Sequence, residues 1–99
     1  MHPDHGGRVV LERELVDERV VRYLVALYTP VAVWRAPVEI ARADGKVTFG
    51  AWEPVAPPAW LVETAQAFAR AEWSARRGPD AEPWPARINR WRAERPARG

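Results

Sequence analysis

Cysteine is absent from the 99 residues, and lysine and methionine occur once each. Without cysteine the chain has no disulfide scaffold and no Cys-ligated zinc module, and it fits a reducing compartment. No apolar run approaches the roughly 18 residues of a transmembrane helix. The start, Met1–Gly7, lacks the basic and apolar segments of a signal peptide. We therefore expect a cytoplasmic protein.

Groups that carry out catalysis are also scarce. Ser74 is the only serine, and both histidines, His2 and His5, lie within the first five residues. A nucleophile needs a base held rigidly beside it, which a terminal tail does not provide. His2, Asp4 and His5 are chemically able to bind a divalent metal, but we interpret this cluster as incidental. Because no glycine-rich phosphate loop is present either, we expect no enzyme, no cofactor and no metal.

Tryptophan and arginine are the residues that the chain has in excess. There are six tryptophans, and arginine supplies 14 of the 15 basic side chains against 13 acidic ones. The preference for arginine, with many alanines, valines and prolines, is typical of a GC-rich bacterial genome. The length predicts one domain that buries about two-thirds of its surface. We place this domain at residues 8–95, between flexible tails at 1–7 and 96–99.

The predicted fold class is α+β, beginning with an N-terminal helix that starts at Asp17. Asp17 is a favourable N-cap, and Thr29-Pro30 ends the helix because the residue before proline resists helical dihedral angles. Apolar residues recur with helical spacing from the residue just before Asp17 onwards. They are Val16, Val20, Leu24 and Leu27.

An antiparallel β-hairpin is predicted around Asp44-Gly45, a pair that favours a two-residue turn. The register that follows places Ile40 opposite Phe49. A lone hairpin is marginally stable, so a further strand must complete the sheet. Residues 8–13, whose pattern fits a strand or a helix, are one candidate. Pairing of Val31–Ala36 with a second chain is the other, which we prefer and which predicts a homodimer.

Two further helices are predicted in the second half of the chain. A long helix spans about residues 58–77, with broad apolar stripes and a stop at Gly78-Pro79. A short C-terminal helix spans residues 85–95 and is ended by Pro96. On this second helix Trp84, Ile88 and Trp91 form one stripe with arginines on both sides.

The tryptophan stripe and its arginines are the predicted partner-binding surface, because both residue types are enriched in interface hot spots. The predicted site consists of Trp84, Arg87, Arg90, Trp91 and Arg92. The function we predict is a non-catalytic protein-interaction module, such as a small regulator or adaptor. The alternative is nucleic-acid binding by the same segment with Arg95 and Arg98, through phosphate contacts and base stacking.

Overall fold

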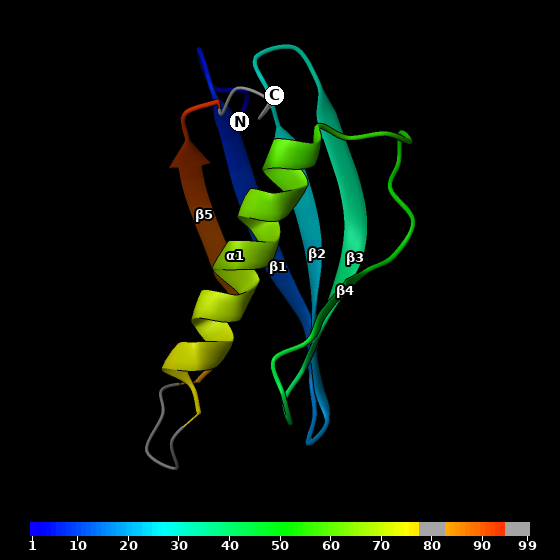
Figure 1. The fold of residues 1–99 in the computed structure, drawn as a ribbon, viewed down its shortest axis with the longest axis vertical. Coiled ribbons are helices and arrows are strands. Elements are labelled where there is room, and N and C mark those ends of the chain that lie inside the picture. The colour runs from blue at the N-terminus through cyan, green and yellow to red at the C-terminus, as the bar shows by residue number, and fades with distance from the viewer. Residues whose placement is uncertain (78–82, 95–99) are drawn as a thin grey trace, which may run out of the picture.

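The computed structural model describes residues 1–77 and 83–94. Its elements, in chain order, are β1 (Gly7–Val16), β2 (Val20–Tyr28), β3 (Val33–Ala41), β4 (Val47–Phe49), α1 (Ala59–Ala75) and β5 (Arg87–Arg92). The strands form a single antiparallel sheet in the order β4-β3-β2-β1-β5. Helix α1 crosses one face of this sheet (Figure 1). The last strand thus returns beside the first strand, at one edge of the sheet.

The predicted N-terminal helix is wrong, because residues 20–28 form the central strand β2. Every second side chain of β2 is buried, as the two-residue period of a strand requires. These side chains are Val21, Tyr23, Val25 and Leu27. Two members of the expected helical stripe, Val16 and Leu24, are instead exposed. β-Branched and aromatic residues pack well on a pleated sheet, and this packing outweighs the helical spacing.

Asp17 has the hydrogen bonds of a cap, but it caps a turn between two strands. Its Oδ1 accepts hydrogen bonds from the backbone N–H groups of Arg19 and Val20, both at 2.8 Å. The same two bonds lower the pKa of the Asp17 carboxyl. A carboxylate that accepts amides two and three residues ahead is compatible with a turn as well as with a helix start. The predicted cap was therefore assigned to the wrong element.

The predicted C-terminal helix is also wrong, since residues 87–92 form strand β5 beside β1. Ile88 lies opposite Leu11, and it is the one residue of β5 that is buried. The stripe of Trp84, Ile88 and Trp91 does not exist, because it required 3.6 residues per turn. Residues 95–99, which include the end of the predicted helix and the predicted tail at 96–99, lie outside the described residues.

The predicted hairpin corresponds to β3 and β4, with a register shifted by two residues. Ile40 lies opposite Val47 and Val38 lies opposite Phe49, because the loop has four residues and not two. Gly45 closes the loop with a φ of +76° and donates its N–H to the Ala41 carbonyl. A shift of two leaves Val38, Ile40, Val47 and Phe49 on one face, as predicted.

The sheet is completed within one chain. Residues 8–13, one of the two predicted candidates, supply the additional strand as part of β1. Residues 33–36 of the segment Val31–Ala36, which we expected to pair with a second copy, pair with β2. The argument that required a second chain therefore no longer holds.

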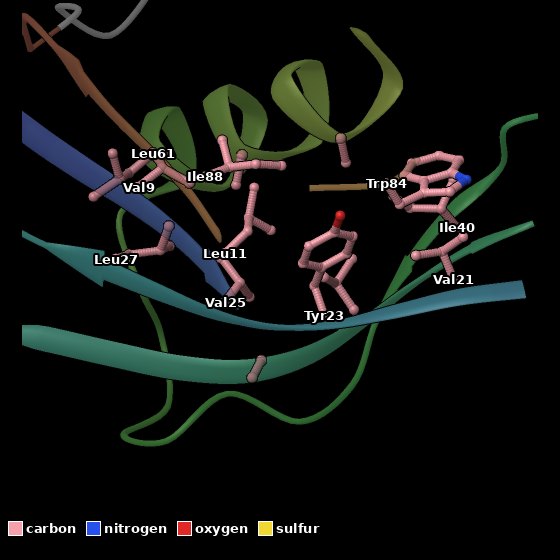
Figure 2. Packing of buried hydrophobic residues seen from close by; sticks show 14 residues of the cluster. Val9, Leu11, Val21, Tyr23, Val25, Leu27, Ile40, Leu61, Trp84 and Ile88 are labelled. Atoms are coloured by element: carbon pink, nitrogen blue, oxygen red, sulfur yellow. The ribbon is translucent and has the colours of Figure 1, made fainter. Parts of the chain in front are cut away.

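A single core joins the sheet to α1, which lies within the predicted range 58–77. The buried residues of the helix are Leu61, Thr64, Ala65 and Ala69, and the small alanines allow close packing against the strands. Figure 2 shows Leu61 beside Val9 and Ile88, with side chains from β1 and β2 pointing towards the helix. No helix within residues 1–77 and 83–94 is long and apolar enough to cross a bilayer. The described chain is thus one small domain of sheet and helix.

Among the large, fully buried side chains of this core, Tyr23 is the one that carries a polar group. Its hydroxyl donates a 2.7 Å hydrogen bond to the carbonyl of Pro85, just before β5. Burial raises the pKa of Tyr23 to about 12. This hydrogen bond links the central strand to the segment that brings the chain back to the sheet edge.

Candidate functional site

The five residues of the predicted partner-binding site do not share one surface. Trp84 is 7% exposed and belongs to the core. Along β5, Arg90 and Arg92 point to the same side as the buried Ile88, whereas Arg87 and Trp91 point to the opposite side. Because a strand alternates its side chains, it divides a set that a helix would have gathered on one stripe.

We call the two sides of the sheet the covered face, which packs against α1, and the open face, which is opposite. Arg87 and Trp91 lie on the open face, where polar and apolar side chains of four strands meet. The strand register places them beside residues of β1, β2 and β3. The neighbours include Arg8, Val10, Glu12, Leu24, Ala26, Tyr28, Arg35 and Asn89.

The first six residues lie against one end of the open face. His2 Nδ1 is 2.7 Å from the Thr29 carbonyl oxygen, and its ring meets Tyr28 edge-on. Pro3 is buried. At the other side, the carbonyl of His5 accepts a 2.8 Å hydrogen bond from Trp91 Nε1. This segment, which we expected to be a tail, therefore fixes the orientation of the Trp91 indole.

A hollow of about 250 Å³ opens in the sheet next to this N-terminal segment. Its floor is apolar and its rim carries charge. We call it the sheet hollow, and its lining residues are Met1, Val10, Glu12, Leu24, Ala26, Tyr28, Arg35 and Arg87.

The charged rim of the sheet hollow is only loosely paired. Arg87 Nε lies 3.9 Å from Glu12 Oε1, and both side chains are more than half exposed. Arg35 makes a long 3.5 Å contact with the Tyr28 hydroxyl. Exposed pairs of this kind contribute little to stability. The two guanidinium groups therefore remain able to exchange these contacts for groups of a ligand.

Trp91 lies on the open face, four positions along β5 from Arg87, and is the most exposed of the described tryptophans, at 42%. Its indole N–H donates a hydrogen bond to the His5 carbonyl, and the His5 ring meets the indole edge-on with ring centroids 5.1 Å apart. The remaining ring surface faces solvent. A fixed, half-exposed indole on an open sheet face is the kind of anchor that interfaces use.

A second, larger depression lies at the far end of the sheet, near the end of α1. It measures about 1060 Å³, and its lining includes Arg19, Arg42, Arg76 and Arg77. Three of these guanidinium groups already have partners within the chain. Arg42 donates to the Asp17 carbonyl, Arg76 is 2.5 Å from Glu72 Oε2, and Arg77 lies over the Trp73 ring. This depression is therefore the weaker candidate site.

The structure adds residues to the site that the sequence analysis missed. The predicted N-terminal helix includes Leu24 and Tyr28, and the predicted site includes neither Val10 nor Arg35. The available signal was the alternation within residues 20–28, which places Leu24, Ala26 and Tyr28 on one face of a strand. No group of three or more His, Asp or Glu side chains within the described ranges is placed to hold a metal ion.

The chain matches no protein-family model, no curated protein and no solved structure. The function must therefore be argued from the chemistry of the open face.

Proposed function

We propose that this protein is a non-catalytic protein-interaction module, such as a small regulator or adaptor, that binds its partner on the open face. The observation that carries the proposal is the sheet hollow, which lies on the face that also presents Trp91. Its apolar floor and guanidinium rim combine the two chemistries that dominate interface hot spots. The lack of cysteine supports a cytoplasmic location for this module.

The size of the hollow favours a protein over a small molecule. Pockets for small ligands usually enclose about 300–1,000 Å³ and cover most of the ligand. The sheet hollow, at about 250 Å³, lies below that range and opens on a sheet surface. It suits one or two anchoring side chains of a partner, with Trp91 and Arg87 contacting the surface around them.

The charge of the open face favours a protein over a nucleic acid. Arg8, Arg35 and Arg87 alternate there with Glu12, and Arg22 is bonded to Glu39 at 2.6 Å. Phosphate backbones are bound by clustered lysines and arginines, and acidic side chains among them oppose this binding. Arg90 and Arg92 lie on the other side of β5, and Arg95 and Arg98 lie outside the described residues.

The predicted homodimer stays a prediction, which light scattering after size exclusion would check.

Affinity enrichment with matched variants tests the proposal. The bait is the full chain, compared with Trp91→Ala, Leu24→Gln and the control Val31→Ala. Val31 is 91% exposed in the loop between β2 and β3. We expect one set of proteins to bind the wild type and the control alike. The two open-face variants should recover this set about tenfold less, the effect of losing roughly 1.4 kcal/mol.

Two controls make this result decisive. Thermal melts must show all variants folded, since a Trp91→Ala chain that unfolds would make Trp91 a core residue. Nuclease treatment and a salt series must leave the recovered set intact, because binding through phosphates falls steeply with salt. Equal recovery by wild type and both open-face variants would contradict the proposed surface.

A further inference from the structure

Strand β5 leaves one side of its backbone unpaired within the described residues. The N–H of Arg13 donates a 2.9 Å hydrogen bond to the carbonyl of Ala86, one residue pair beyond the β1–β5 ladder. This bond fixes which residue pairs of the ladder are hydrogen-bonded. In an antiparallel ladder, residues that bond to the partner alternate with residues that do not. The amides of Ile88, Arg90 and Arg92 therefore face β1, and those of Arg87, Asn89 and Trp91 face outward.

The outward groups form an edge about 20 Å long, at about 3.4 Å per residue. No other strand of residues 1–77 and 83–94 pairs with this side of β5. The carbonyl of Asn89 has a side-chain contact, 3.0 Å from Arg90 Nη1. The opposite edge differs, because β4 has three residues. An extended segment can therefore be added as a strand far more readily at β5.

Positive charge lies on both sides of this edge. Arg90 and Arg92 point to the covered face, and Arg87 points to the open face, as Trp91 does four residues later. Arg92 lies over the Phe68 ring at 5.1 Å, so its guanidinium group is held at the rim of α1. Glu12, at 3.9 Å from Arg87, is the acidic group that makes an ion pair with β5 in the described chain.

This charge disfavours a second copy as the occupant of the edge. Pairing β5 with itself would bring the three arginines of each copy into one ladder of two strands. Like charges across neighbouring strands destabilise a sheet, and charged edge residues are a common means of preventing self-association. The same charges attract an acidic strand.

We propose that β5 binds an extended acidic segment of a partner protein, which adds to the sheet as a sixth strand. This inference rests on the proposed protein-interaction function and specifies the kind of partner. Opposite Arg90 and Arg92, the segment presents Asp or Glu on the covered face. The residue between them points to the open face and is apolar, because it lies beside Trp91. The segment therefore alternates acidic and apolar residues.

A synthetic peptide with the core Glu-Leu-Glu-Leu-Glu is the probe, and amide hydrogen exchange followed by NMR is the measurement. On binding, exchange at the amides of Arg87, Asn89 and Trp91 should slow by about tenfold or more, because only these amides gain acceptors. The amides of Ile88 and Arg90, already bonded to β1, should change little. A peptide of the same sequence with N-methyl groups on alternate residues should lose this protection.

A charge reversal separates strand addition from general adhesion. The variant Arg90→Glu should bind the Glu-Leu peptide about tenfold more weakly and gain affinity for a Lys-Leu peptide. The matched control is Arg70→Glu, an exposed arginine on α1, which should bind the Glu-Leu peptide nearly as the wild type does. Thermal melts and the exchange of the β1 amides confirm that both variants are folded.

Three outcomes would overturn the inference. One is a peptide that binds and shifts Leu24 and Tyr28 without protecting the β5 amides, which leaves the open-face interaction standing. The second is a Lys-Leu peptide that binds the wild type equally well. The third is absence of peptide binding by a chain that still captures its protein partner through Trp91. These outcomes differ from the one that would contradict the proposed function, in which the open-face variants capture partner proteins as well as the wild type does.

Discussion

The covered and open faces of this sheet are built from the same strands, yet their chemistry is opposite. Along β2, Tyr23 is completely buried and bonded to the Pro85 carbonyl. Tyr28, five residues later, is half-buried on the open face beside His2 and Arg35. Two residues of a strand that are an odd number of positions apart point to opposite faces of the sheet, so these two tyrosines lie in different environments.

Under the proposed function, the two faces of the sheet divide stability and binding between them. Helix α1 covers one face and supplies the apolar area that holds the domain together. The open face has no such layer in the described residues beyond the N-terminal segment at one end. Its side chains are therefore free to evolve contacts with a partner at a small cost in stability.

The largest expected effect comes from matched leucines on the two faces. Leu11 is 1% exposed on the covered face, and Leu24 is 37% exposed on the open face. Leu11→Ala should lower the free energy of unfolding by about 2–5 kcal/mol, because it leaves a cavity beneath α1. Leu24→Ala should lower it by less than about 1 kcal/mol. Urea denaturation followed by tryptophan fluorescence measures both.

A large loss in Leu24→Ala would contradict the division between the faces. It would mean that a further layer, supplied by a second copy or by the rest of the chain, buries the open face. Light scattering on the same samples distinguishes these two sources.

A smaller effect, visible in the pH dependence of stability, is expected from Tyr23. Its pKa is raised from 10.0 to about 12 by burial, so the unfolded chain releases this proton first as pH rises. The stabilisation is complete below pH 10 and is lost as pH increases towards 12. Tyr23→Phe should remove this part of the alkaline slope and cost about 1 kcal/mol near neutrality, through the lost hydrogen bond.

Urea denaturation at a series of alkaline pH values compares the wild type with Tyr23→Phe and with Tyr28→Phe as control. Tyr28 is half-buried on the open face. If the free energy of unfolding of Tyr23→Phe still falls between pH 10 and pH 12 as the wild type's does, another group causes this fall. The burial of the Tyr23 hydroxyl would then not be the source of the pH dependence.

The errors of the sequence analysis follow from how each element is stabilised. In residues 20–28, apolar side chains recur both at every second position, as in a strand, and at every third or fourth position, as in a helix. The spacing of Val20, Leu24 and Leu27 predicted a helix, but the alternation of Val21, Tyr23, Val25 and Leu27 decided the structure. Valines and tyrosines favour strands, and a central position between β1 and β3 pairs both backbone edges of the segment.

Strand β5 could not have been found from local pattern alone. It has six residues with one buried side chain, so alternation is hardly visible. Its pairing with β1 joins residues that are about 80 positions apart, as the Arg8 to Asn89 hydrogen bond shows. The long helix, in contrast, has a full set of small and large apolar residues at helical spacing, and the structure contains a helix there.

The site was predicted by residue type and not by geometry. Arg87 and Trp91 share the open face, four positions apart on β5, but Trp84 belongs to the core. The floor of the sheet hollow was missed, since it comes from strands β1 and β2, whose secondary structure was left open or assigned wrongly. Residue composition is thus the basis of the predicted interaction, whereas the register of the sheet decides which residues share a surface.

The smallest expected effect concerns the ion pair between Arg22 and Glu39, which face each other across β2 and β3 on the open face. Arg22 Nη2 is 2.6 Å from Glu39 Oε1, and both side chains are more than 40% exposed. Glu39 raises the pKa of the Arg22 guanidinium group. A double-mutant cycle with Arg22→Ala and Glu39→Ala should give a coupling of about 0.2–1 kcal/mol that weakens as salt is added. A coupling above this range that resists salt would show that water is excluded from this part of the open face, and the two faces would then differ less than their exposure indicates.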